Sequence, residues 1–404
     1  MKNYFLFELQ QLIKSKKTIG LWCLLVILAG VYSFHDRQYR PIERIDKNEM
    51  EQRYLTRQSF LEEQAENPSD HWSATMAVGM FEPWNQAEGQ RLAALDAKDW
   101  QKYAEATSQW YQLSLAYTDN EIIFFTPDYY TYQNYYAAYD GKYGYASTAK
   151  WMESASKLPN KKLSKNVLEQ KTGIQSVQRA FVSFLPFVFL GVTLFLAIDS
   201  LTKDRRHKSL FLSLPVTVDD VLWAKTAALF LVSTLMMSST LVLIWFGVGC
   251  QFGFGSLDLP VSILSSAFDA RYPIDAIDAF YTQPIGSFLL QCLGVGLFLQ
   301  LIYIRGILLL STLWRSELAN LLIAGFGVIS PLIFQRRWFS AFLDKSANVY
   351  LYQNYGQILS GYSRFYFGSA KFELSKGLLL FGIVWLLIEI GLFVRVQTKQ
   401  FKLV

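Results

Sequence analysis

Apolar and polar stretches alternate along the chain, and six apolar runs are long enough to cross a membrane. A bilayer core about 30 Å thick needs about 20 apolar residues per helix, and lipid offers no partner for the backbone amides of an open structure. The pattern therefore predicts six transmembrane helices, over residues 18–34, 180–198, 227–250, 288–312, 318–334 and 377–394. Only residues 313–317 separate the fourth run from the fifth, so we expect these two helices to form a tight antiparallel hairpin.

The composition agrees with a membrane protein. Of the 404 residues, 52% are apolar or aromatic and only 18% are charged, whereas soluble domains carry about 25% charged residues. Intrinsic disorder is therefore excluded, and an ordinary soluble enzyme is disfavoured. The three cysteines, Cys23, Cys250 and Cys292, all lie in or beside apolar runs, which argues against a disulfide framework and against a CxxC metal site.

Charge is distributed unevenly along the chain. Residues 35–178 carry a net charge of −4, while the rest of the chain carries +9. With a cytoplasmic N-terminus, the predicted inner segments hold 12 Lys and Arg in roughly fifty residues, and the short outer segments hold 7 in more than seventy. Because Lys and Arg favour the cytoplasmic side, we expect a multi-pass protein of the cell (cytoplasmic) membrane with both termini in the cytoplasm.

Residues 1–17 have an amphipathic pattern of their own. Phe5, Leu9, Leu12 and Ile13 fall on one face of a helix, and the polar residues fall elsewhere. This pattern predicts an elbow helix that lies in the inner membrane interface and leads into the first span. Two other interpretations remain open: a helical extension of the first span into water, or a cleaved signal peptide.

Residues 35–178 contain no run that could span a membrane, and they are too many for a linker. Residues 42–66 and 88–117 have helical character, and turn residues punctuate the segment. We predict a mainly helical extracytoplasmic domain here, followed by a membrane domain over residues 179–404. The predicted fold class is thus an all-α polytopic membrane protein, with six transmembrane helices and an N-terminal amphipathic elbow helix.

No motif for catalysis or for metal binding occurs. The chain has no G-x-x-x-x-G-K-[ST] phosphate loop, because Gly141-Lys142 is followed by Tyr143 and lacks the upstream glycine. It also has no H-E-x-x-H and no G-x-S-x-G. We therefore expect no catalytic residues, no metal site and no cofactor bound by this chain.

The loop over residues 199–222 carries the most informative pattern. An acid ends the second apolar run, a charged cluster and apolar residues follow, then a proline, and a lysine opens the next run. This order resembles the first cytoplasmic loop of type 2 ABC transporter permeases, the exporter class with six spans per subunit. The matching positions are Asp199 or Asp204, Ser209-Leu210, Ser213-Leu214-Pro215 and Lys225. The glycine that usually precedes the leucines is replaced by Lys208-Ser209.

Other parts of the chain agree with that family. Residues 1–17 look like its elbow helix, and residues 311–319 look like its short turn between spans four and five. The likeness covers roughly 260 residues of the membrane part; a large segment after the first span is known only in some branches of the family. The resemblance implies a permease subunit that works with a separate ABC ATPase, which binds ATP and Mg. It also implies a second permease copy or a paralogue, and no nucleic acid.

The loop has a physical interpretation beside the resemblance. Apolar side chains can enter a cleft of a partner protein while charged neighbours set the register, and a loop held in this way can transmit a rigid-body motion. The candidate ATPase-coupling residues are Asp204, Arg205, Arg206, Leu210, Phe211, Leu214 and Pro215. The alternative is an ordinary basic cytoplasmic loop.

Two further groups are candidate functional residues. Arg305 and Glu389 lie within predicted spans, where an unpaired charge costs at least about 2.5 kcal/mol. Three interpretations remain open. The two residues pair with each other, or they face an inner vestibule, or the fourth span ends near Ile304 and Arg305 lies at the membrane interface. A tyrosine-rich stretch offers a surface for substrate stacking, although such residues are more often core or membrane-belt residues. Its candidate members are Tyr129, Tyr130, Tyr132, Tyr135 and Tyr136.

The sequence thus predicts the permease subunit of an ATP-driven exporter for an amphipathic, peptide-like or lipid-like substrate. One alternative is a non-transporting membrane sensor or immunity protein with a ligand-binding outer domain. Another is a mechanotransmitting ABC permease, which normally has four spans instead of six.

Overall fold

The computed structural model describes residues 2–118, 137–206, 217–267, 277–314, 316–334 and 345–397. Most of these residues are helical, and among them there is one two-stranded sheet. The chain divides into two compact units. The membrane unit comprises Met1–His35, Val177–Gly247 and Leu289–Val404, and the α3–α6 unit comprises Asp36–Ser176 and Val248–Phe288.

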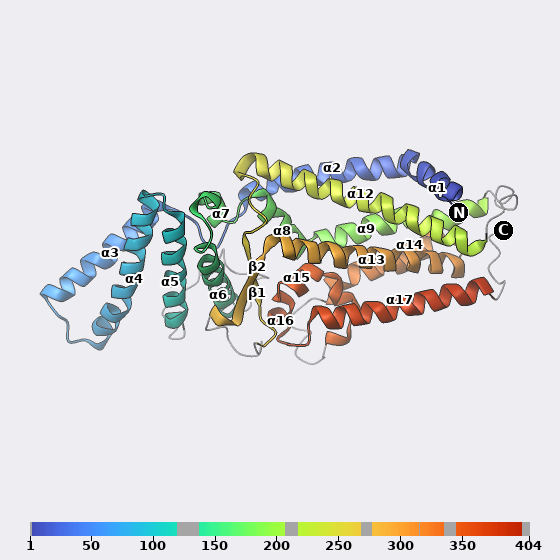
Figure 1. Cartoon of the computed structure of the whole chain (residues 1–404). Coiled ribbons are helices and arrows are strands. Elements are labelled where there is room, and N and C mark those ends of the chain that lie inside the picture. The colour runs from blue at the N-terminus through green and yellow to red at the C-terminus, as the bar shows by residue number, and fades with distance from the viewer. Residues whose placement is uncertain are drawn as a thin grey trace. The chain divides into compact units, whose positions relative to one another are not determined.

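Among the described residues, six helical segments are long and apolar enough to cross a membrane, one for each predicted run. Five of them contain α2 (Lys16–His35), α12 (Val218–Phe252), α13 (Ile285–Leu313), α14 (Glu317–Phe334) and α17 (Leu374–Gln397). The sixth, Leu185–Lys203, comprises α9 (Leu185–Ala197) and the residues that follow it, since α9 alone has 13 residues. In Figure 1 the axes of α2, α12, α13 and α17 run in roughly the same direction. The prediction of an all-α polytopic membrane protein is confirmed, because these six apolar helices account for most of the membrane unit.

Helix α1 (Lys2–Lys14) is separate from α2. Ser15 stands between them, and its Oγ accepts a hydrogen bond from the backbone N–H of Thr18 at 3.1 Å. A serine in this position satisfies one of the unpaired amides at the start of a helix. The break before the first span therefore has a local cause, and α1 is a helix in its own right.

The second span begins later than predicted. The expected helix over residues 180–198 is divided at Phe184 into α8 (Gly173–Ser183) and α9. Pro186 lies in the first turn of α9, where its missing N–H costs nothing, whereas inside a continuous helix it would remove a hydrogen bond. Helix α10 (Ser200–Arg206) follows α9.

Short helices between α14 and α17 pack into the membrane unit. They are η6 (Lys345–Ala347), η7 (Val349–Gln353), α15 (Tyr355–Leu359) and α16 (Tyr362–Phe367). Every residue over 351–366 is buried, and η7 packs against both α14 and α17. Gly356 permits the close approach, since a Cβ there would lie 2.1 Å from the carbonyl oxygen of Phe181. The sequence placed this stretch in a short outer segment and did not predict its burial.

Four helices form the main part of the other unit, and each packs against the next in chain order (Figure 1). They are α3 (Lys47–Glu66), α4 (Trp72–Asp96), α5 (Trp100–Thr118) and α6 (Ala137–Ala155). Shorter helices are η1 (Asp36–Gln38), η3 (Asn160–Lys162), α7 (Lys165–Leu168) and η4 (Ile277–Ala279). The stretch 88–117, predicted to have helical character, is divided between α4 and α5, because Lys98 adopts a left-handed conformation with φ of 52°.

An antiparallel hairpin completes the α3–α6 unit. Strand β1 (Pro260–Leu264) pairs with β2 (Phe280–Pro284). The indole N–H of Trp151 on α6 donates to the carbonyl of Pro260 at 2.6 Å, and Ser154 and Thr282 share a hydrogen bond of 2.8 Å between their hydroxyls. The unit therefore includes, besides the predicted residues 35–178, a hairpin that comes from about 100 positions further along the chain.

Candidate functional site

The first turns of α12 are the centre of the candidate site. Thr217 caps this helix, since its Oγ1 accepts from the backbone N–H of Asp220 at 3.2 Å and donates to the Asp220 carboxylate at 2.9 Å. Asp219 and Asp220 also place negative charge in the first turn, which the helix dipole favours. The helix that receives the predicted coupling loop therefore starts at a well-defined point.

Helix α1 is joined to α12 by a buried ion pair. The Lys225 ammonium lies 2.7 Å from Glu8 Oε1, and the Tyr4 hydroxyl donates to the same oxygen at 2.6 Å. Lys225 is 2% exposed and Glu8 is 5% exposed. Tyr4 also packs against Val221. Because a buried charge is tolerated only when it is paired and hydrogen-bonded, this contact fixes the position of α1 against α12.

A second ion pair joins the start of α2 to the end of α9. The Lys17 ammonium lies 2.6 Å from Asp199 Oδ1, and the Lys203 ammonium lies 2.8 Å from Asp199 Oδ2. Both Lys17 and Asp199 are partly buried. A cavity of about 370 Å³ is lined by residues of both ion pairs, including Glu8, Lys225, Asp199 and Lys203.

The structure brings Arg305 and Glu389 together. Arg305 Nε lies 2.7 Å from Glu389 Oε1, and Arg305 Nη2 lies 2.5 Å from Glu389 Oε2. This two-pronged geometry joins α13 to α17. The guanidinium also stacks on Trp223 of α12, with its carbon 4.2 Å from the ring centre, and reaches Thr226 at 3.5 Å. Helix α13 continues to Leu313, so Arg305 does not lie at the end of its span.

These contacts converge on one stretch of α12. Lys225 binds α1, while Trp223 and Thr226 contact the arginine that binds α17. We call the set formed by Glu8, Lys225, Trp223, Arg305 and Glu389 the α12 hub. The hub thus joins α12 directly to α1 and, through Arg305, to α13 and α17.

The coupling residues predicted from the sequence precede α12 along the chain. Asp204, Arg205 and Arg206 form the end of α10. Leu210, Phe211, Leu214 and Pro215 lie outside the described residues, as do Tyr129, Tyr130, Tyr132, Tyr135 and Tyr136. The described stretches that flank residues 207–216 are α10, which follows Asp199, and α12, which carries the hub.

Sequence reasoning did not find the role of Glu8. It considered only the apolar residues of α1, as a face toward the membrane interface, whereas in the structure Tyr4 and Glu8 are the buried residues of this helix. The available signal was the spacing of four residues between Tyr4 and Glu8, which puts both on one side of a helix. That signal was too weak to identify Lys225 as the partner, because 217 residues separate it from Glu8.

The α3–α6 unit holds a second buried charge network. Glu43 accepts hydrogen bonds from Arg91 at 2.6 Å, Tyr103 at 2.6 Å and Tyr111 at 2.8 Å. Glu88, which has no exposed side-chain surface, lies within 4 Å of three arginines that also contact Trp84 or Trp110. These arginines are Arg53, Arg57 and Arg91.

The pKa values in this network follow from burial and charge. Burial by itself lowers the pKa of Arg91, but the nearby Glu43 carboxylate and its neighbours outweigh that effect and raise the pKa well above its usual value. Burial lowers the pKa of Arg57 and raises that of Tyr103. Arg91 is therefore a permanent cation and Tyr103 a permanent neutral donor, so the network stays assembled across physiological pH.

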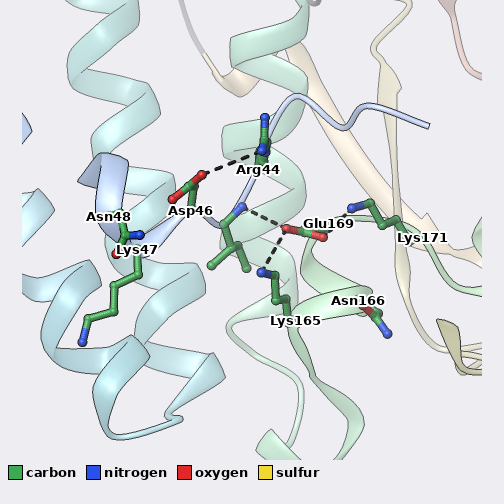
Figure 2. A pocket seen from close by; sticks show the side chains of 9 residues that line it. Arg44, Asp46, Lys47, Asn48, Lys165, Asn166, Glu169 and Lys171 are labelled. Carbon is green, nitrogen blue, oxygen red and sulfur yellow. Dashed lines mark hydrogen bonds and ion pairs between the residues drawn. The ribbon is translucent and has the colours of Figure 1, made fainter. Parts of the chain in front are cut away.

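A polar cavity of about 480 Å³ lies beside the start of α3. Figure 2 shows Glu169 at its centre, contacted by Lys165 and Lys171. Glu169 also accepts the backbone N–H of Ile45 at 3.0 Å, which ties the segment before α3 to α7. The cations around this cavity are engaged by carboxylates of the same unit, so the contacts shown have a structural role.

Comparison with known proteins gives one match. A family model described as ABC-2 family transporter protein matches residues 3–360, which is most of the chain. No curated protein matches the chain, and no solved structure does.

Proposed function

Because the chain belongs to the ABC-2 family of transporter proteins, we propose that it exports an amphipathic substrate, peptide-like or lipid-like, with energy from a separate ATPase. The chain is the permease subunit of an ABC transporter and a multi-pass membrane protein. ATP and Mg then bind in the ATPase, and a second permease copy or a paralogue completes the pathway. The direction of transport, the substrate class, the separate ATPase and the second permease copy all belong to this proposal.

The α12 hub is the observation that carries the coupling role. It lies within three turns of the start of α12, and α10 and α12 flank the loop that resembles the ATPase-binding loop of the family. A force on this loop acts first on the N-terminal turns of α12. Lys225 then transmits it to α1, and Trp223 and Arg305 transmit it to α13 and α17.

Single ion pairs between helices suit this task. Packed helices shift between discrete arrangements more readily than they deform, and interface ion pairs exchange when they shift. We infer that the first turns of α12 move between two positions as the ATPase binds and hydrolyses ATP. The hub then transmits this movement to the other spans. The chain itself carries out no bond-breaking step in this mechanism.

The test is to break the loop contact while the hub is left intact. Replacing Leu210 and Phe211 by Asp places charge in an apolar interface, which should release the ATPase from the purified permease. The matched control is Leu210→Met with Phe211→Leu, which keeps the surface apolar. We expect loss of co-purified ATPase and of permease-stimulated ATP hydrolysis in the first variant alone, with the partner identified by mass spectrometry as an ABC ATPase.

Undiminished ATPase binding and hydrolysis in the Asp variant would remove the coupling role from this loop. If no ABC ATPase accompanies the wild-type permease at all, the proposed energy coupling fails, and the result favours a sensing or immunity role instead.

We also propose that both termini lie in the cytoplasm and that the α3–α6 unit lies outside. In a background without native cysteines, Ser69→Cys and Ala370→Cys should react with an impermeant thiol reagent in intact cells. Both positions are exposed in the structure. Ser209→Cys in the loop should react only after the cells are opened. Labelling of Ser209→Cys from outside would reverse the proposed orientation.

A further inference from the structure

A cavity of about 290 Å³ lies within the membrane unit, among α13, α14, α17 and η7. Its lining is apolar except for Tyr303, Tyr350 and Gln353, and none of the lining residues is charged. Small-molecule sites are typically apolar pockets with a few polar groups, from about 300 Å³ upwards. At ~30 Å³ per water-sized group, this cavity has room for about ten such groups, which corresponds to one alkyl chain of medium length.

Two glycines keep the cavity open. Gly306 of α13 and Gly327 of α14 both line it. A Cβ at Gly306 would lie 3.4 Å from the Ile388 side chain, and a Cβ at Gly327 would lie 3.4 Å from the Tyr303 hydroxyl. A methyl group would therefore be in van der Waals contact with the opposite wall, and a larger side chain at Gly306 would occupy the space itself.

One part of the lining carries an unmatched hydrogen-bonding pair. Gln353 is only 3% exposed, and its Nε2 donates to the Tyr303 hydroxyl at 2.8 Å. The other amide atom, Oε1, is buried and has no hydrogen-bond partner within the described part of the chain. Tyr303 accepts the bond from Gln353, and among the residues that the structure describes its own proton has no acceptor. Native structures rarely leave buried polar atoms unsatisfied, so the pair points to a ligand with both a donor and an acceptor.

We propose that this cavity binds a neutral amphiphile, whose alkyl chain fills the apolar space and whose amide or hydroxyl group bonds to Gln353 Oε1 and to the Tyr303 hydroxyl. A carboxylate or an ammonium group is disfavoured because no lining residue supplies a counter-charge, and burial of an unpaired ion is costly. The inference names the substrate class of the proposed exporter and rests on that proposal. Unlike the coupling role, binding of the amphiphile to this cavity does not require the ATPase.

The test uses the full-length chain in phosphatidylcholine nanodiscs and a tritiated decanamide with a diazirine on its chain. We expect saturable photolabelling of peptides from α13, α14 and η7. Unlabelled decanamide should compete, whereas decanoate at neutral pH should compete at least tenfold less well. Replacing Gly306 by Leu should abolish the labelling. Gly294→Leu is the matched control, because Gly294 lies on the same helix, outside the cavity, with open space around its Cβ.

A second variant protects the test against misfolding of Gly306→Leu. Gln353→Leu together with Tyr303→Phe removes the polar pair while the apolar space remains. This double variant should weaken the binding of decanamide about tenfold or more, without changing how well unlabelled decane competes for the site. Size-exclusion profiles of all variants check their assembly.

Labelling that cannot be saturated, or that spreads over all lipid-exposed helices, would show a bulk lipid contact and overturn the proposal. The proposal also fails if Gly306→Leu leaves labelling unchanged, or if cross-linking shows a second copy covering this face. Since the assay contains no ATPase, its failure leaves the coupling role untouched. Conversely, loss of ATPase binding in the Leu210 and Phe211 variant does not affect the labelling.

Discussion

The two units bury charge in different ways. In the α3–α6 unit, Glu43 accepts from three donors, and Glu88 lies among three arginines. In the membrane unit, Glu8 faces one cation and Glu389 faces one cation, and each pair joins two helices that are distant in the sequence. Glu43 and Glu88 therefore belong to a network of several cations and donors, whereas each hub carboxylate of the membrane unit is paired with a single cation.

On the proposed coupling mechanism, this difference separates a rigid unit from one whose helices shift against each other. Hydrogen bonds in a shared network support one another, so the helices of the α3–α6 unit are held in one arrangement. Each hub carboxylate faces one cation, so its ion pair can open or exchange when the helices shift, while Tyr4 still bonds Glu8 and Trp223 still contacts Arg305. The comparison predicts that changes to the network affect stability alone, whereas changes to the hub affect coupling as well.

The largest expected effect is the loss of Arg91. Arg91→Met leaves the buried Glu43 without the cation that pairs with it and removes one of the three arginines around Glu88. It should lower the free energy of unfolding of the α3–α6 unit by about 3–5 kcal/mol. Urea unfolding of the full chain in nanodiscs can be followed by tryptophan fluorescence, because Trp84 and Trp110 lie against the network. Arg53→Met is the control: Arg53 is 35% exposed and should cost less than half as much. Equal losses would show that the network does not depend on its buried member.

Lys225 is the sharpest test of the hub. Lys225→Met leaves Glu8 buried without its cation and should cost about 3 kcal/mol. The double variant Glu8→Leu with Lys225→Met removes both charges and should recover most of that stability. It should still lack permease-stimulated ATP hydrolysis, because the ion pair between α1 and α12 is gone. Recovery of hydrolysis together with stability would assign the pair a purely structural role.

A smaller effect is expected at Glu389. Glu389→Gln keeps a hydrogen-bond acceptor for Arg305, and the position is 26% exposed, so we expect a loss of about 1 kcal/mol. The arginine also retains Trp223 and Thr226. The rate of permease-stimulated ATP hydrolysis should fall by more than the small loss of stability, measured as the melting temperature, can explain. If the rate of ATP hydrolysis is unchanged, the contact between Arg305 and Glu389 plays no part in coupling, and only the contact between α12 and α1 remains as a coupling route.

The smallest effect belongs to Glu153 of the α3–α6 unit, a partly exposed carboxylate that pairs with Lys150 and Lys157. Hydrogen bonds from Lys150 and then Lys157 lower the pKa of Glu153. Its contribution to stability is therefore present above the unfolded pKa of about 4.3 and is lost as the pH falls through the lower folded pKa. Glu153→Gln should cost within about 0.5 kcal/mol at pH 7 and nothing at pH 3, as measured by unfolding at both pH values. A larger loss of stability from Glu153→Gln at pH 3 than at pH 7 would contradict the lowered pKa of Glu153.

The sequence by itself determined the features that depend on local pattern. Six apolar runs predicted the six spanning helices, since length and hydropathy alone decide whether a helix can cross lipid. The short break between the fourth and fifth runs predicted the end of α13 at Leu313 and the start of α14 at Glu317. The loop over residues 199–222 pointed to the family that the comparison shows. Arg305 and Glu389 stood out because charges within apolar runs are rare.

Only the tertiary structure decided which distant residues meet. Lys225 pairs with Glu8 across 217 positions, and Trp151 binds the hairpin across 109. Residues 351–366 are buried although their sequence is that of a polar and aromatic loop. Side-chain spacing shows which face of a helix is apolar, but the neighbour of that face depends on how all the helices pack, because burial and ion pairing are properties of two partners together. The cavity around Gly306 and Gln353 exists for the same reason: its walls come from four elements, and none of them encloses space alone.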